Sequence, residues 1–550
     1  MEFLFSKLFV IIFNVSYYPH YKLGVLIMSV VVHLVLNYVL LRKSSRMRLP
    51  PGPWPWPVVG NLLQLCQGGK NLHKTFASLA QQYGPIVYLR LGSVHTVVVS
   101  SPVMAKEFLK THDQEFQYRP KPTLAAEILM GNKGMVTTGG PLSRHLRRIC
   151  LTELFATKQL QSFESMRTKE INNTINDIHM ESEEGKVVDL KSRLSSLGIN
   201  ILTHMMFRKR YFGVDESKHN EIHCFKEVTT KVPHWLGILI ISDYIPSLRW
   251  LVRLQGIEAS LHALRHKKSQ FIQKLIAEHK NLTIEVDQVK DSGNENVAKT
   301  PKDFVDILLS APQEDGTGNL SDETIETLIL EMLAGGAETS SLTIEWAMAE
   351  LIRNPMIMKR AQMELERVVG MNRIIEESDL HKLTYLQAVI KETLRLHPPG
   401  PLLVPHSSTI KVCGIAKDYD IPPHTRVMVN VWAMGRDPSI WERPFEFYPE
   451  RFLQQGQEHH HIATEIIDMD ENNFKLFPFG SGRRACPGRP LGILVVQIIL
   501  ARLLHSFHWV LPNHQEPNTL DMSEEFGLTL PRAQPLHLKA YPKLQANLYK

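Results

Sequence analysis

Residues 477–488 read Phe477-Pro-Phe-Gly-Ser-Gly-Arg-Arg-Ala-Cys-Pro-Gly488, and this stretch decides the fold of the chain. Five of its residues stand at fixed spacing, in the pattern Phe479-x-x-Gly482-x-Arg484-x-Cys486-x-Gly488. A thiolate that binds a metal is open to competing ligands and oxidants unless the backbone wraps closely around it. Glycine allows such wrapping because it lacks a Cβ atom and accepts positive φ angles. The pattern therefore indicates a wrapped, metal-binding thiolate at Cys486.

Residues 489–504 follow this loop and are mostly apolar. They predict a helix that begins beside the sulfur of Cys486. The N-terminal end of a helix carries partial positive charge, which stabilises a nearby thiolate.

The loop resembles the haem-binding loop of the cytochrome P450 family. The resemblance implies that Cys486 is the axial ligand of the haem iron, where a thiolate favours O–O cleavage. Gly482 and Gly488 would let the backbone approach the flat cofactor, and Phe479 would cover the sulfur. Arg484 would bind a haem propionate. The alternative is a buried free cysteine in a glycine-rich turn, the commoner case for an isolated cysteine.

A second decisive stretch spans residues 321–354, which have helical periodicity after a possible N-cap at Ser321. Its middle reads Gly335-Gly-Ala-Glu-Thr-Ser340. Adjacent glycines cost a helix roughly 1 kcal/mol each, so we expect them to open a groove for O₂ and substrate. Glu338 and Thr339 would then deliver protons, as in the family's oxygen-activation motif, which this stretch resembles. The alternative is a packing notch beside an ordinary threonine.

Three further residues resemble the family's Glu-Arg-Arg network. Glu392 and Arg395 stand at i,i+3 on one predicted helix, and Arg451 follows in Phe447-Tyr-Pro-Glu-Arg-Phe452. A surface ion pair is the default for such spacing. The resemblance instead implies a structural role in the core on the haem side.

The segment Pro141-Leu-Ser-Arg-His-Leu-Arg-Arg-Ile-Cys150 departs from the family pattern. Relatives usually carry Trp-Arg where this chain has Ser143 and Arg144, and both are expected at a haem propionate. The resemblance leaves Arg144 as a cofactor-binding residue. Arg147 and Arg148 form a basic face that an acidic reductase would fit, although a solvated helix face is an equal alternative.

His406 stands where many relatives have a propionate-binding arginine, so the resemblance assigns it to the cofactor as well. It lies in residues 399–408, which predict a strand near the haem. Residues 125–138 are expected to form an irregular loop that contacts substrate, and residues 236–251 resemble the family's access lid. A single sequence does not give the geometry of these selective segments.

Composition describes one large catalytic unit, because 550 residues with 43% hydrophobic content lack an internal linker after about residue 60. The charge is 62 basic minus 56 acidic side chains, or +6. This is too mild for nucleic acid but suits an anionic membrane or an acidic partner. The five cysteines show no paired spacing, which disfavours disulfides and zinc and fits a reducing, cytosol-facing body.

The N-terminal region predicts a membrane anchor. Residues 23–41 are apolar and long enough to span a bilayer, and the basic residues after them would remain cytosolic. A cleaved signal peptide is the alternative. We expect a tail over residues 1–22, the anchor over 23–41, a basic and proline-rich hinge over 42–60 and a haem-thiolate domain over 61–550.

Together these resemblances imply a mainly α fold with small β-sheets, the cytochrome P450 fold with an N-terminal transmembrane helix, of the plant microsomal (A-type) kind. They imply haem b, O₂, and electrons from NADPH through NADPH-cytochrome P450 reductase. The expected reaction is hydroxylation of a small lipophilic metabolite, whether phenolic or flavonoid, terpenoid or fatty acid. The expected location is the endoplasmic reticulum membrane, in a single pass.

Three other functions compete with this hypothesis. An O₂-independent haem-thiolate isomerase or dehydratase is disfavoured by Glu338 and Thr339. A non-catalytic haem-binding protein is suggested by Ser143, and a structural membrane protein would contain no haem.

Overall fold

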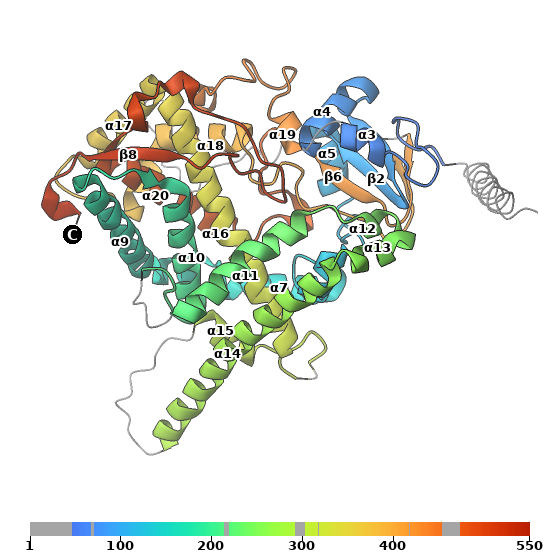
Figure 1. Cartoon of the computed structure of the whole chain (residues 1–550), viewed down its shortest axis with the longest axis horizontal. Coiled ribbons are helices and arrows are strands. Elements are labelled where there is room, and N and C mark those ends of the chain that lie inside the picture. Colours follow the sequence, from blue (N-terminus) through green and yellow to red (C-terminus); the bar gives the residue numbers. More distant parts are fainter. Residues whose placement is uncertain are drawn as a thin grey trace, which may run out of the picture.

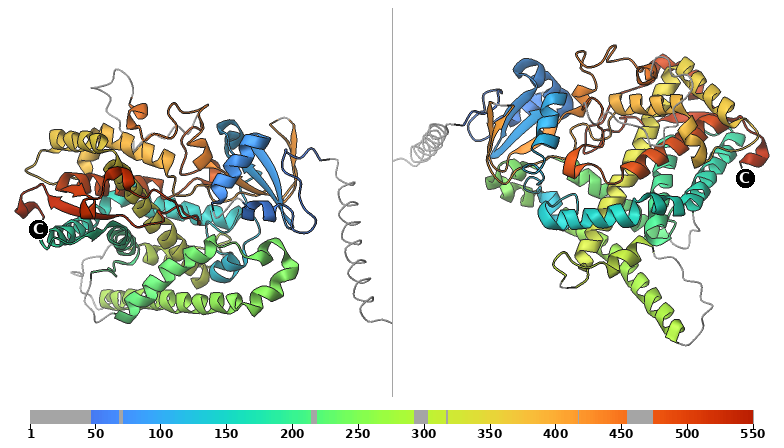
Figure 2. Two further views of the ribbon diagram at one scale, coloured as in Figure 1. Left: turned by 45° about the horizontal axis from the view of Figure 1, so that its top comes forward. Right: turned by 180° about the vertical axis from the view of Figure 1, so that it is seen from behind.

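The computed structural model describes residues 47–67, 71–213, 219–291, 303–316, 318–416, 418–453 and 474–549. The predicted tail and membrane anchor lie outside the described residues. Within them the chain is mainly helical with small sheets, as expected, and the sheet β1-β2-β6 lies at one end beside α3, α4 and α5 (Figure 1). The views in Figure 2 show the same division between this end and the helical body.

The helices in the first half of the chain are α3 Leu62–Gln67, α4 Leu72–Tyr83, α5 Pro102–Lys106, α6 Leu124–Met130, α7 Gly140–Ile149, α8 Thr157–Ser162, α9 Glu164–Glu183, α10 Leu190–Phe207, α11 His219–Gly237, α12 Ile241–Tyr244, α13 Arg249–Leu254 and α14 Ile257–Asp291. Those that follow are α15 Phe304–Ser310, α16 Asp322–Arg353, α17 Pro355–Val369, α18 Thr384–Leu396, α19 Val431–Met434 and α20 Arg489–Ser506.

The strands form three small sheets. Their bounds are β1 Ile86–Leu91, β2 Val94–Val99, β3 Val188–Asp189, β4 Val412–Ile415, β5 Tyr419–Ile421, β6 Arg426–Val429, β7 Phe507–Val510 and β8 His537–Pro542. β1 and β2 form an antiparallel hairpin, and β6 adds parallel to β2. The second sheet has the order β3-β8-β7, and β4 pairs with β5.

Helix α16 crosses the helical body, with α10 and α20 packed along it. Ser321 caps its first turn by accepting a hydrogen bond from the Thr324 N–H, as its position predicts. The two adjacent glycines of α16 differ in their surroundings. A Cβ atom on Gly336 would lie 2.8 Å from a methyl group of Leu202 in α10, so this glycine permits close helix packing. A Cβ atom on Gly335 would meet nothing within 4 Å.

Helix α20 is the one helix in the described part of the chain that is long and apolar enough to cross a membrane. However, 78% of its apolar window is buried inside the protein. The core therefore covers its apolar surface, so the apolar residues that follow the cysteine loop belong to a buried helix.

Two local predictions were wrong. The segment expected to be irregular over residues 125–138 begins as helix α6 Leu124–Met130, whose first turn is capped by the Thr123 hydroxyl accepting from the Ala126 N–H; residues 131–138 are non-helical as expected. Residues 399–408 form turns and isolated bridges instead of a strand. Leu403 has a φ of 50°, which is incompatible with an extended strand.

Glu392, Arg395 and Arg451 meet in the core. Arg395 forms two 2.7 Å hydrogen bonds with the Glu392 carboxylate, and the side chains of both residues are completely buried. Arg451 Nε lies 3.1 Å from Glu392 Oε2. The Tyr448 N–H also donates to Glu392, so one carboxylate joins α18 to the segment after residue 446.

We expect Glu392→Gln to lower the free energy of unfolding by about 3–5 kcal/mol, because it leaves two guanidinium groups without a buried counter-charge. Urea denaturation measures the loss. Glu446→Gln is the matched control, since the Glu446–Arg443 pair is about half exposed; we expect it to leave the free energy of unfolding nearly unchanged. Equal effects of the two substitutions would contradict the structural role.

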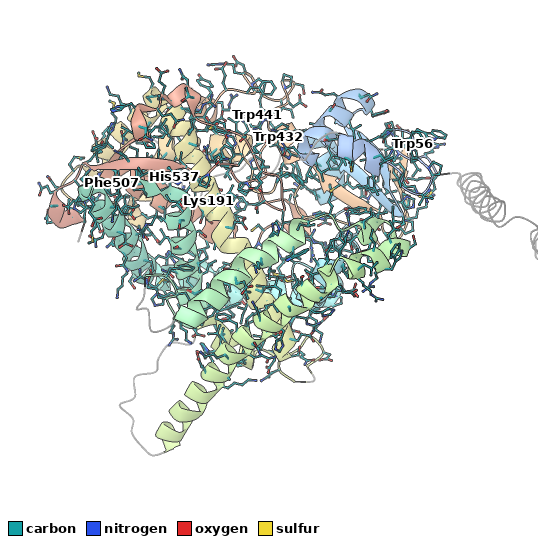
Figure 3. The ribbon with its side chains drawn as sticks, in the orientation of Figure 1. Trp56, Lys191, Trp432, Trp441, Phe507 and His537 are labelled. Atoms are coloured by element: carbon teal, nitrogen blue, oxygen red, sulfur yellow. The ribbon has the colours of Figure 1, made fainter. Side chains whose placement is uncertain are left out.

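A second buried carboxylate, Glu524, ties the C-terminal region to α4 and α19. It accepts hydrogen bonds from His73 at 3.2 Å, Lys74 at 2.8 Å and Trp432 at 2.9 Å, and Arg436 lies 3.8 Å away (Figure 3 labels Trp432). Burial alone raises the pKa of Glu524. The hydrogen bonds and the Arg436 charge outweigh burial and hold that pKa well below its ordinary value.

We expect this network to make the protein acid-sensitive. In the unfolded chain Glu524 takes up a proton near pH 4.3, whereas in the folded chain it stays ionised, so its stabilising contribution is present above about pH 4–5 and is lost as the pH falls. Glu524→Gln should therefore destabilise most at pH 7, and its difference from wild type should narrow toward pH 3. Urea unfolding across this range measures the difference, and a pH-independent gap would refute the assignment.

Candidate functional site

The cysteine loop is wrapped as its sequence predicts. The Cys486 N–H donates to the Phe479 carbonyl at 2.8 Å. Gly482 has a φ of 69°, and a Cβ atom there would lie 2.1 Å from the Leu109 carbonyl oxygen, so only glycine fits. Gly488 precedes α20, and a Cβ atom on it would lie 4.0 Å from the Cys486 sulfur. The loop thus encloses the sulfur while leaving Cys486 exposed on one side.

The charge state of Cys486 depends on opposing effects. Burial among protein atoms raises the pKa of the Cys486 thiol. The backbone N–H groups of Gly488 and Arg489 and the charge of Arg147 act in the opposite direction and favour the thiolate. These groups come from the start of α20 and from α7, so the fold supplies part of the stabilisation that a thiolate ligand needs.

The middle of α16 faces this loop. Gly335 is exposed and Glu338 and Thr339 are partly accessible, although nearly all of the helix on either side is buried. The Thr339 hydroxyl donates to the Gly335 carbonyl at 2.7 Å. A Cβ atom on Gly492 of α20 would lie 3.9 Å from Ser340 Oγ and 3.8 Å from the Phe479 ring. Ser340, the residue after Thr339, therefore lies where α16, α20 and the cysteine loop meet.

Arg484 binds the loop of residues 134–138. Its guanidinium donates to the carbonyls of Met135 at 3.2 Å, Val136 at 3.0 Å and Thr138 at 2.6 Å. It also donates to the hydroxyl of Ser143, which itself donates to the Met135 carbonyl. Ser143 thus takes a structural place beside the predicted propionate ligand.

Glu331 of α16 holds the same loop from its other side, and sequence reasoning missed it. The N–H groups of Val136 and Thr137 donate to its carboxylate at 3.0 and 3.1 Å, and the Thr137 hydroxyl donates at 3.3 Å. Burial raises the pKa of Glu331, and the loop N–H groups oppose the rise. The loop of residues 134–138 therefore lies between a carboxylate and a guanidinium, with its N–H groups facing one and its carbonyls the other.

Arg119 is a second residue that sequence reasoning missed. It donates to the carbonyls of Val136, Val404 and Pro405 at 2.8–3.1 Å. Its charge adds to burial in lowering the pKa of His406 to about 3, so His406 is neutral at pH 7. A histidine in place of an arginine at position 406 implies that a cation comes from elsewhere, but the sequence does not say which.

The structure places Arg144 away from this cluster, contrary to the prediction that it binds the cofactor. Arg144 is exposed and donates to the side chain of Gln117 at 3.2 Å. Arg147, one helical turn later, lies in the field of Cys486 and of Arg484. The helical period explains the difference, because Arg147 stands four residues after the buried Ser143 and shares its inward side, whereas the adjacent Arg144 is turned away from it.

These residues fit a haem. In addition to burial, Arg484 and Arg147 lower the pKa of Arg119, and Arg147 lowers that of Arg484, so the three guanidinium groups share one electric field. Glu331 is the carboxylate among them, and the excess positive charge suits an anionic group. Arg484 Nε is buried without a hydrogen-bond partner among the described residues. Cys486 would hold the iron, with Arg484 and Arg119 at the propionates and Phe479 beside the sulfur.

We expect Ser143→Ala to loosen the haem site. The substitution removes the hydroxyl that accepts from the Arg484 guanidinium, and a hydrogen bond to a charged group contributes roughly 1.5–3 kcal/mol of stabilising free energy. The rate of haem transfer to apomyoglobin should therefore rise about tenfold or more. Ser162→Ala is the control, since Ser162 is exposed and bonds only Gln159 within its own helix. Unchanged haem transfer from the Ser143 variant would show that Arg484 needs no such support.

The comparisons with known proteins agree with this geometry. The family model described as Cytochrome P450 matches residues 50–537. "Cytochrome P450 703A2" of Arabidopsis thaliana is 39% identical over 94% of this chain and 98% of its own length. "Flavonoid 3'-monooxygenase" of Petunia hybrida is 38% identical over 96% and 99%. A zebrafish cytochrome P450 solved with abiraterone has a TM-score of 0.66 and 24% identity, and the match covers 86% of this chain and 99% of that one. The chain therefore belongs to the cytochrome P450 family, and it is an oxidoreductase of the monooxygenase type.

Proposed function

We propose that the chain is an NADPH-dependent haem-thiolate monooxygenase that hydroxylates a small lipophilic plant metabolite, with flavonoids as the first class to test. The observation that carries this proposal is the acid–alcohol pair Glu338 and Thr339, on the accessible stretch of α16 that faces the Cys486 loop. An isomerase or a dehydratase that uses no O₂ has no need of a proton relay at this place.

The overall reaction consumes one O₂ and two electrons: RH + O₂ + NADPH + H⁺ gives ROH + H₂O + NADP⁺. When bound, a thiolate-ligated haem supplies the activation of O₂. The protein must then supply protons at one face and exclude bulk water. Thr339 would present its hydroxyl oxygen there, because its own proton is held by the Gly335 carbonyl. Glu338 would pass protons to it from its partly buried carboxylate.

Flavonoids are placed first because of the relatives. "Flavonoid 3'-monooxygenase" and "Flavonoid 3',5'-hydroxylase" are names of proteins about 38% identical over most of this chain. The open space at Gly335 also suits a flat ligand that approaches the helix backbone closely. Terpenoids and fatty acids are the other substrate classes to be tested in the same experiment.

The redox partner would be NADPH-cytochrome P450 reductase at the endoplasmic reticulum membrane. Arg144 and Arg148 are exposed on α7, the helix that also carries Arg147 toward Cys486. A basic surface this close to the sulfur suits an acidic electron donor. Trp54 and Trp56 are exposed at the start of the described chain, a residue type enriched at membrane interfaces (Figure 3 labels Trp56).

The proposal is tested with full-length protein in membranes. The reduced, CO-bound protein should show a thiolate-haem spectrum, and one of the flavonoid, terpenoid or fatty-acid sets should give a saturable spectral shift. With reductase and NADPH, that compound should gain one oxygen atom from ¹⁸O₂. Oxygen incorporation that fails for every class, in protein with an intact thiolate spectrum, would overturn the proposed substrate range. A missing thiolate spectrum would overturn the monooxygenase itself.

A further inference from the structure

Residues 521–533 form a turn that reaches from the surface to the middle of α16. The two sides of this turn are joined by hydrogen bonds from the Glu525 N–H to the Pro531 carbonyl and from the Ala533 N–H to the Ser523 carbonyl, both 2.9 Å. Its base is fixed by the Glu524 network described above. The tip, residues 526–530, therefore projects from a rigid base.

The tip touches α16 through two adjacent residues. The Thr529 hydroxyl donates to Glu338 Oε1 at 3.0 Å. The Leu530 carbonyl accepts from the indole N–H of Trp346 at 3.0 Å, and the Leu530 N–H donates to the Pro399 carbonyl at 3.0 Å. Because both backbone groups of Leu530 are held, the preceding hydroxyl is aimed at Glu338 before any substrate binds.

Thr529 is the hydrogen-bond partner of Glu338 among the described residues, and its chemistry suits that carboxyl group. A hydroxyl donates to an ionised carboxylate and accepts from a protonated one. Thr529 can therefore hold Glu338 in both of the states that a proton relay visits. A valine of the same shape can hold it in neither.

The same tip also meets the end of α11. A Cβ atom on Gly237 would lie 2.8 Å from the Leu528 backbone nitrogen, so the two backbones are in close contact. Gly237 lies in residues 236–251, the segment that resembles an access lid. A movement of this segment would press directly on the residue before Thr529.

We propose that Thr529 is a positioning residue that orients the Glu338 carboxyl group toward Thr339 and thereby couples electron use to product formation. This inference rests on the proposed monooxygenase function. The order of transfer is from Glu338 to the Thr339 hydroxyl, with Thr529 returning Glu338 to the same orientation after each proton has left. Without Thr529, electrons from NADPH still reach O₂, but protons arrive at the wrong place and reduced oxygen leaves as H₂O₂.

The test compares Thr529→Val, which keeps the shape and removes the hydroxyl, with Thr529→Ser, which keeps the hydroxyl. Thr519→Val is the matched control, because Thr519 is exposed and its hydroxyl donates to the Glu516 carbonyl of its own turn. The fraction of NADPH electrons recovered in hydroxylated product should fall about fivefold in Thr529→Val, with a matching rise in H₂O₂. Thr529→Ser and Thr519→Val should keep the wild-type ratio.

A second arm separates proton delivery from folding and substrate binding. When H₂O₂ replaces O₂ and NADPH, RH + H₂O₂ gives ROH + H₂O, and the oxidant already carries both protons. Thr529→Val should therefore keep its peroxide-driven rate. An equal loss in both arms, or a serine variant as poor as the valine variant, would overturn the positioning role.

A third readout needs no turnover. The infrared difference spectrum of the wild-type holoprotein minus Glu338→Gln should contain the Glu338 carboxyl band. That band should shift to higher frequency in Thr529→Val, since a hydrogen bond is lost, and stay in place in Thr519→Val. An unshifted band would refute the contact itself. This measurement does not depend on substrate, so it remains valid even if the proposed substrate range is wrong.

Discussion

A single thiolate imposes the main constraint on this protein. Burial raises the pKa of Cys486, so a thiolate at this place needs positive potential around it. Backbone N–H groups at the start of α20 and the guanidinium of Arg147 on α7 oppose the rise in pKa and supply part of that potential. The start of α20 and helix α7 must therefore keep a fixed position relative to the Cys486 sulfur. The buried Glu392–Arg395–Arg451 network, on α18 and the segment after it, provides rigid structure on the same side of the molecule.

The departures from the family pattern are absorbed by one loop. Residues 134–138 present carbonyls to Arg484 and N–H groups to Glu331, so this peptide segment lies between the guanidinium and the carboxylate and bonds both. Ser143 is small enough to enter this arrangement and supplies one acceptor to Arg484. Its hydroxyl bonds Arg484 and the Met135 carbonyl, so it would stabilise the arginine where a tryptophan would contact the cofactor. Arg119 likewise supplies the charge that His406 lacks.

The sequence predicted what depends on local spacing. The cysteine loop, the capped helix through Gly335 and Gly336, and the meeting of Glu392 with Arg395 all follow from residues near one another in the chain. What it could not predict depends on contacts across the fold. Glu331 meets residues almost two hundred positions earlier, and Thr529 meets Glu338 across a similar separation. Arg144 was misplaced for a local reason, since the sequence alone did not fix which face of α7 turns inward.

The adjacent glycines of α16 have different consequences for how this enzyme can change. Only glycine fits at position 336 without rearrangement, because a side chain there would push against Leu202 and separate α10 from α16. Gly335 has no such neighbour, and an alanine there would even favour the helix by roughly 1 kcal/mol. Gly336 therefore governs the spacing of two helices, whereas the preceding Gly335 borders open space. A small side chain can be added at residue 335 without a clash, while the same change one residue later alters the packing of α10 against α16.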